Sequence, residues 1–128
     1  MKSFFLFCGL ILFAGLLSTG LAADTAPKGK VHHVVCFKFA ENATAAQIQK
    51  VDADFRALKS KIHQIKSLKA GTNMSPEKLN KGFTHCWELT FKNAADRDAY
   101  LVHPAHKAFG GSLGSTIADV FVFDFIAK

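Results

Sequence analysis

Apolar residues in this 128-residue chain change their spacing several times, and the order of those changes restricts the fold. A spacing of two, in which every second side chain is apolar, is typical of a strand with one buried face. A spacing of three and four is typical of a helix with one buried stripe. Strand-like segments are expected at residues 31–39, 65–72, 83–91 and 119–126, and the helical stripe at residues 48–62.

Local signals mark where the helices begin and end. Thr44 and Gln47 have the pattern of a capping box, in which the threonine hydroxyl accepts from the backbone N–H of Gln47 and the glutamine side chain reaches back. Asn93 is positioned to cap a second helix. His103 should end that helix, because Pro104 disfavours helical geometry in the residue before it and can itself begin a new turn.

The resulting order is β-α-β-β-α-β, with the second helix broken in two. This order is the ferredoxin-like split βαβ arrangement. We therefore predict an α+β fold, in which a four-stranded antiparallel sheet carries both helices on one face.

The sheet face away from the helices needs a cover. We assign to it a mixed but largely apolar set, which is too apolar to remain fully in water: Val34, Cys36, Cys86, Val120 and Val122. Two copies related by a two-fold axis would cover this face with each other. The sequence therefore predicts a homodimer.

The first residues indicate export. A short basic start at residues 1–3 precedes an apolar stretch at residues 4–17, and small residues follow at 18–23. This order is typical of a signal peptide, and the apolar stretch is shorter than the roughly 20 residues of a membrane-spanning helix. We expect cleavage after Ala22 or Ala23, with an uncleaved membrane anchor as the alternative. Residues 24–30 would be a flexible lead-in and residues 31–128 a single domain, secreted or periplasmic and without a stable membrane anchor.

The distribution of charge limits the kinds of partner that the protein is expected to bind. The formal net charge is +6, but the lysines are scattered and no basic stripe alternates with aromatic residues. Such a surface is typical of a soluble basic protein and argues against a nucleic-acid partner. No cofactor is expected.

Histidines and one tyrosine are the candidates for chemistry. His33 and His85 share one sheet face by parity, whereas His103 and His106 follow the second helix close to Tyr100. Histidine can move protons near neutral pH, and a tyrosine hydroxyl can stabilise an oxyanion. We assign His106 as the base, Tyr100 as the oxyanion partner and His33 as the support.

Two other readings of these histidines stay open. In the architectural reading, His103 and His106 fix the helix break by bonding to backbone groups. In the metal reading, three histidines form an open zinc-type site. The carboxylates that usually orient such ligands are missing from the pattern, so no metal is expected.

Cys36 and Cys86 lie on adjacent predicted strands and face away from the helices. If they sit opposite each other in register, a cross-strand disulfide can form, and the oxidising compartment favours it. A bond between subunits and two buried free thiols are the alternatives.

Several motifs resemble the Dabb family, the stress-responsive dimeric α/β barrels. They are residues 33–39, residues 71–75 with 79–85, residues 100–106, Phe109 and the terminal strand at 120–125. The resemblance spans about residues 31–126 and implies a dimeric α+β barrel. The family's functions are diverse: many members are known only as stress-associated proteins, and a few plant relatives are polyketide cyclases.

In those cyclases, residues that match His33, Tyr100 and His106 surround a pocket between sheet and helices. The corresponding pocket residues here are Val35, Phe37, His85, Trp87, His103 and Phe109. Phe37 and Trp87 depart from the cyclases, which keep smaller aliphatic residues there. We therefore expect an exported stress-responsive dimeric barrel protein without established catalysis that binds a small apolar ligand, with a polyketide-cyclase-like lyase that uses a His/Tyr pair as the alternative. A haem-degrading monooxygenase on a related barrel is a third option, although no haem-family motif is present.

Overall fold

The structure, a computed structural model, describes residues 28–128. The predicted signal peptide and residues 24–27 of the lead-in lie outside the described residues. The described chain forms, in order, β1 (Val31–Phe39), α1 (Ala45–Lys61), β2 (Ser67–Thr72), β3 (His85–Phe91), α2 (Ala94–Val102), α3 (Pro104–Ser112), the short 3₁₀ turn η1 (Gly114–Thr116) and β4 (Ile117–Ile126).

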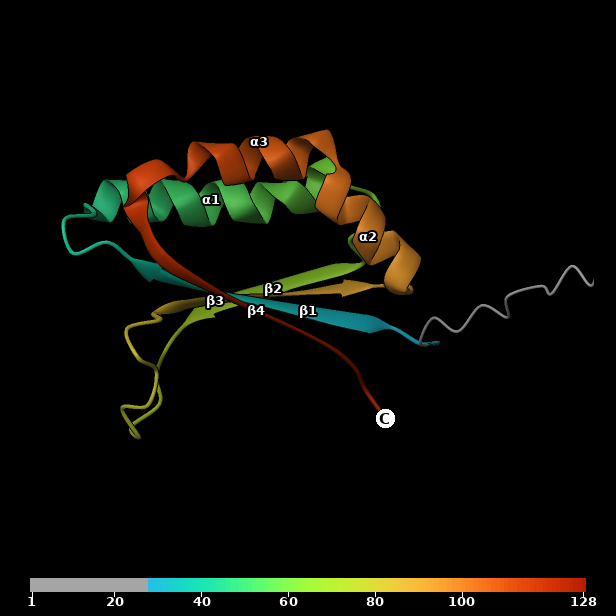
Figure 1. The fold of residues 1–128 in the computed structure, drawn as a ribbon, viewed down its shortest axis with the longest axis horizontal. Coiled ribbons are helices and arrows are strands. Elements are labelled where there is room, and N and C mark those ends of the chain that lie inside the picture. Colours follow the sequence, from blue (N-terminus) through green and yellow to red (C-terminus); the bar gives the residue numbers. More distant parts are fainter. Residues whose placement is uncertain (1–27) are drawn as a thin grey trace, which may run out of the picture.

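The strands form one antiparallel sheet in the order β2-β3-β1-β4. The three helices cover one face of this sheet, and the opposite face carries no helix (Figure 1). The predicted fold class is therefore confirmed. We call the uncovered side the open face.

The strand ends differ slightly from the prediction. β2 begins at Ser67 rather than at 65, and β3 begins at His85 rather than at 83. Phe83 belongs instead to a tight turn, in which its N–H donates to the carbonyl of Asn80 at 2.8 Å. Single backbone hydrogen bonds continue beyond the strand ends, such as the bond from the N–H of Lys66 to the carbonyl of Thr90 at 2.8 Å.

The helix boundaries follow the predicted caps. The hydroxyl of Thr44 accepts from the N–H of Gln47 at 3.2 Å, and the side chain of Gln47 accepts from the N–H of Thr44 at 2.8 Å. The side chain of Asn93 accepts from the N–H of Asp96 at 2.9 Å. Side-chain acceptors of this kind satisfy backbone donors that have no partner inside the helix.

The core lies between the helices and the sheet. Val51, Phe55 and Leu58 of α1 are buried against the inner face of β1 and β3, where the indole of Trp87 is fully enclosed. The Nε1–H of Trp87 donates to the Oδ1 of Asp52 at 3.0 Å, so the one polar atom of the ring is satisfied.

The register of β4 corrects part of the predicted open face. Val122 lies opposite Val35, and Val120 lies opposite Phe37, which places both valines on the inner side. Parity along one strand shows which residues share a face, but only the pairing shows which face is inner.

The open face carries instead a strip of three aromatic rings: Phe121, Phe123 and Phe125. Phe121 is paired with Cys36, and Phe123 is paired with Val34, as predicted for those two β1 residues. Phe123 is 56% exposed. Within residues 28–128, no helix has both the length and the apolar character needed to cross a membrane.

Candidate functional site

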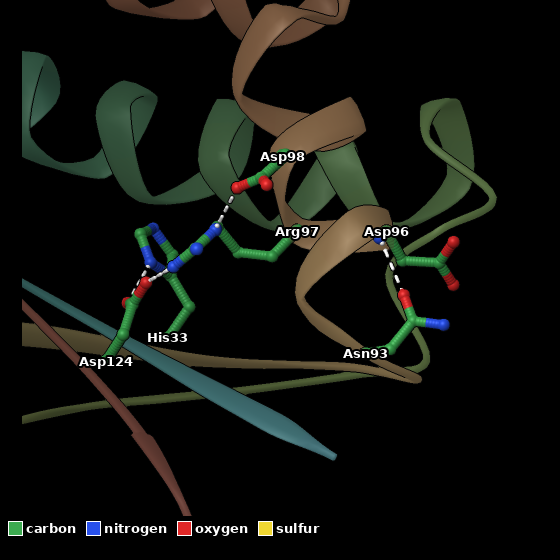
Figure 2. Close-up of polar contacts among 6 residues, drawn as sticks. All are labelled: His33, Asn93, Asp96, Arg97, Asp98 and Asp124. Atoms are coloured by element: carbon green, nitrogen blue, oxygen red, sulfur yellow. Dashed lines mark hydrogen bonds and ion pairs between the residues drawn. The ribbon is translucent and has the colours of Figure 1, made fainter. Parts of the chain in front are cut away.

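His33 is held from two directions. Its Nδ1 lies 2.5 Å from the Oδ1 of Asp124, which occupies the paired position on β4. Arg97, from α2, donates through Nη1 to the other oxygen of Asp124 and through Nε to Asp98 at 2.7 Å. Figure 2 shows the Arg97 side chain reaching from the helix toward His33 and Asp124. The carboxylate of Asp124 thus joins an imidazole on its own sheet to a guanidinium above it.

Burial sets the protonation of His33. The residue is only 4% exposed, and this burial, followed by the nearby guanidinium of Arg97, lowers the pKa of His33 to about 4. The imidazole is therefore neutral at pH 7. Since Nδ1 faces a carboxylate, that nitrogen carries the proton and donates to Asp124, which leaves Nε2 as an acceptor.

Tyr100 lies between two histidines. Its ring centroid is 5.6 Å from that of His33 and 4.4 Å from that of His106. The tyrosine is buried on α2, and burial raises the pKa of its hydroxyl. The phenol therefore keeps its proton and can act as a hydrogen-bond donor.

His106 is fixed by the backbone. Its Nδ1 donates to the carbonyl oxygen of Leu101 at 3.1 Å. Burial lowers the pKa of His106, the bond to Leu101 partly offsets this, and the neighbouring His33 and His103 lower it further. The neutral ring thus has an unprotonated Nε2, as a general base requires.

His103 has the architectural role that was one of the two alternatives. Its Nδ1 accepts from the N–H of Ala105 at 3.1 Å, so this side chain caps the start of α3. The structure therefore brings His33, Tyr100 and His106 together, whereas His103 caps α3 at the helix break. We call His33, Tyr100 and His106 the His–Tyr centre.

His85 does not join this centre. It pairs with Phe37, whereas His33 pairs with Leu89, so the two histidines are roughly 13 Å apart along the sheet at about 3.3 Å per residue. The ring of His85 contacts those of Phe39 and Trp87, with centroids 5.0 and 5.9 Å away, and its Nδ1 bonds to the hydroxyl of Thr84. His85 therefore shares the sheet face of His33, as predicted, but lies apart from Tyr100.

The other predicted pocket residues form a cluster of aromatic rings. The ring of Phe37 lies 5.0 Å from Trp87 and 6.5 Å from Phe109, and Phe55 lies 4.7 Å from Trp87 and 4.9 Å from Phe109. Val35 is buried beside them. These side chains occupy the space between sheet and helices next to the His–Tyr centre.

Two residues of the site, Asp124 and Arg97, were not predicted from the sequence. Asp124 is the one acid in the alternating segment Val120–Phe125, and Arg97 lies on the helix that carries Tyr100. An acid at an inner position of an apolar strand is a signal that a partner is needed. The partner itself, 91 residues away, could not be read from local spacing.

Cys36 and Cys86 are register partners on the open face and are free thiols in the structure. Burial, together with a hydrogen bond to Cys86, raises the pKa of the Cys36 thiol to about 12. Among residues 28–128, no group of three or more histidine, cysteine or carboxylate side chains is arranged to hold a metal ion.

The fold and the site define a ferredoxin-like α+β protein with a buried histidine–tyrosine centre. The chain belongs to the Dabb family, the stress-responsive A/B barrel domain, whose sequence model matches residues 31–127. Among curated proteins, a stress-response A/B barrel domain-containing protein of Arabidopsis thaliana is 30% identical over 77% of this chain and 90% of its own length. Olivetolic acid cyclase of Cannabis sativa is 28% identical over 77% of this chain and 97% of its own length.

Solved structures show the same fold. The hydroxynitrile lyase from Passiflora edulis superposes with a TM-score of 0.73, at 27% identity, over 80% of this chain and 96% of the lyase. A protein of unknown function from Bacteroides fragilis, described as dimeric with a ferredoxin-like fold, superposes with a TM-score of 0.63, at 28% identity, over 78% of this chain and 98% of its own. The family thus includes enzymes and members without an assigned activity.

Proposed function

We propose that this chain forms an exported homodimer in which the His–Tyr centre transfers protons to and from a small carbonyl compound, as in a lyase or cyclase. The observation that carries the proposal is the position of Tyr100, whose ring contacts both His33 and His106. A protonated phenol whose ring packs against two neutral imidazoles supplies both a donor and a base for proton abstraction next to a carbonyl.

Each group has a defined task. The Nε2 of His106 removes a proton from the carbon beside the carbonyl, and the electrons move to the carbonyl oxygen. The hydroxyl of Tyr100 donates to that developing oxyanion. His33 borders the other side of Tyr100, and its orientation is fixed by Asp124, which Arg97 in turn holds. The cyclase and the lyase among the similar proteins support this class of reaction.

The experiment follows exchange of the carbon-bound protons of small ketones and aldehydes into D₂O by NMR. We expect the wild-type protein to accelerate exchange and the His106→Ala protein to lose the acceleration. His63→Ala is the matched control, because His63 is exposed in the turn after α1. Exchange that survives in His106→Ala would remove the proposed role of His106, and no acceleration by the wild-type protein would remove the enzymatic proposal.

A second candidate is a dimer that binds a small apolar ligand without turnover. The aromatic cluster favours it, because Phe37, Phe55, Trp87 and Phe109 occupy space beside the centre that a larger substrate would need. This candidate predicts saturable binding of apolar molecules together with unaccelerated proton exchange.

The dimer part of the proposal rests on the open face. The strip of Phe121, Phe123 and Phe125 adjoins Val34 and Cys36, and a contiguous apolar surface of this kind is unusual on a protein that stays alone in water. A second copy with the same strip would cover it across a two-fold axis. The dimeric relative from Bacteroides fragilis supports this assembly.

Export is proposed from the N-terminal sequence. Expression of the full-length chain in a secreting host, with intact-mass measurement of the protein outside the cells, tests it. We expect a chain that begins at residue 23 or 24, and a full-length cell-bound protein would contradict export.

A further inference from the structure

A hollow of about 620 Å³ lies on the open face, beside the segment that joins β2 to β3. Figure 1 shows this segment projecting from the sheet on the side away from the helices. Cys36 and Cys86 line the hollow together with three large apolar residues, Leu79, Phe83 and Phe121. The volume is within the range of small-molecule sites, roughly 300–1,000 Å³. None of its lining residues belongs to the His–Tyr centre.

The wall of the hollow is held in place before any ligand arrives. The N–H of Asn73 donates to the carbonyl of Thr84 at 2.8 Å, and the N–H of Thr84 donates to the carbonyl of Phe37 at 3.1 Å. The side chain of Asn80 donates to the carbonyl of Phe83 at 3.0 Å. A ligand would therefore not have to order this loop, which is one of the usual costs of binding.

The backbone of this loop also adopts a left-handed conformation of the kind found at ligand-binding segments. Lys81 has a φ of 49° although it is not glycine, and Gly82 follows with a φ of 86°. A left-handed non-glycine residue costs free energy and persists where the surroundings impose it, as they often do at ligand clamps. Here it places Lys81 in the lining of the hollow.

The charges at the hollow favour an anion. Lys69 and Lys81 both line it. The one acid in the lining, Glu88, already accepts from the Nδ1 of His32 at 2.7 Å. Glu88 also lies opposite Lys69 in the register of β2 and β3, so the lining carries two ammonium groups against one carboxylate, and Lys81 is the one without an acid paired to it among the lining residues.

We propose that this hollow binds a small carboxylic acid with an apolar body, such as a medium-chain fatty acid. The carboxylate meets Lys69 and Lys81, and the apolar body lies against Phe83, Phe121 and the two thiols. In the proposed dimer the partner's sheet covers the outer side of the ligand. The site is separate from the His–Tyr centre and goes beyond the proposed proton-transfer function.

Calorimetric titration of the purified dimer with decanoate tests this site, with decanol as the uncharged probe. We expect decanoate to bind more tightly than decanol. The double change Lys69→Ala and Lys81→Ala should weaken decanoate binding roughly tenfold, as expected when two exposed ion pairs are lost, and should leave decanol binding unchanged.

Glycine provides a matched pair of blocking variants. Gly71 lines the hollow, and a Cβ atom added there would meet no atom within 4 Å. Gly71→Leu should therefore fill the hollow and abolish decanoate binding without strain. Gly110→Leu, at an equally open position on α3 and remote from the hollow, should bind as the wild type does.

Several results would overturn the proposal. They are no decanoate binding at millimolar concentration, equal affinity for decanol, and binding that survives both Gly71→Leu and the double lysine change. Absence of binding in a confirmed dimer would show that the partner's own side chains fill the hollow. Because His106→Ala should leave decanoate binding intact, failure of this site and failure of the proton-transfer proposal are distinguishable.

Discussion

The imidazole of His33 and the carboxylate of Asp124 face each other across β1 and β4, with Nδ1 and Oδ1 2.5 Å apart. This contact fixes the tautomer of a buried histidine and anchors the guanidinium that reaches down from α2. It therefore links the sheet, the helix and the His–Tyr centre, and it makes the site sensitive to single substitutions.

Asp124→Asn should destabilise the protein by roughly 1–3 kcal/mol, because it leaves Arg97 without its half-buried acceptor charge. Urea denaturation at pH 7 measures the change. Asp98→Asn is the matched control: Asp98 contacts the same arginine but is 64% exposed, so its loss should cost less than about 1 kcal/mol. Equal losses of stability in the two variants would show that the bond to Asp124 stabilises the protein no more than the bond to Asp98 does.

Stability should fall in acid because of His33. The folded pKa is about 4, below the ordinary value of 6.5, so between these values the unfolded chain binds a proton that the folded chain does not. The free energy of unfolding keeps its full value with respect to His33 above pH 6.5. It decreases as the pH falls toward 4, by up to roughly 3 kcal/mol. Urea midpoints at pH 7, 5.5 and 4 should show this slope, and His33→Gln should flatten it. An unchanged slope in His33→Gln would assign the acid sensitivity to other groups.

Tyr100→Phe should lower the rate of ketone proton exchange by about 10²-fold or more, since it removes the donor to the oxyanion while the ring remains. The remaining exchange rate of the Tyr100→Phe protein should still change with pH as His106 gains or loses its proton. Circular dichroism and thermal melting serve as the control for folding. A well-folded Tyr100→Phe protein with wild-type exchange rates would exclude the hydroxyl from the reaction.

Phe123→Lys should convert the dimer into a monomer, because it buries an ammonium in the proposed interface without a partner. Sedimentation velocity at micromolar concentration measures this. Val102→Lys is the matched control, since Val102 is 63% exposed on α2, on the helical side of the sheet. A wild-type protein that sediments as a folded monomer would overturn the dimer itself.

Cys36 and Cys86 should form a disulfide within one chain on oxidation. Directly opposed residues of an antiparallel pair have Cα atoms about 4.5–5.5 Å apart, inside the range that a disulfide spans. Intact mass should increase by about 2 Da per chain on reduction, and the oxidised form should be more stable by roughly 2–4 kcal/mol. A covalent dimer on a non-reducing gel would instead place the bond between subunits, and no mass change would leave two free thiols.

Much of this architecture followed from local pattern. The capping box at Thr44, the break at His103–Pro104 and the inner faces of β1 and β3 were all predicted, because each depends on neighbours in sequence. Tyr100 and His106 also came together as expected, since the helix and the turn after it are adjacent in the chain.

The sequence by itself determined the order of the elements and therefore the fold class, because apolar period and capping are properties of short segments. Only the tertiary structure decided the register of β4. That register put Val120 and Val122 on the helix side of the sheet, where both stay about half exposed, put the phenylalanine strip on the open face and placed Asp124 beside His33. A strand's alternation is the same whichever face is buried, so the choice depends on pairing with residues far away in the chain.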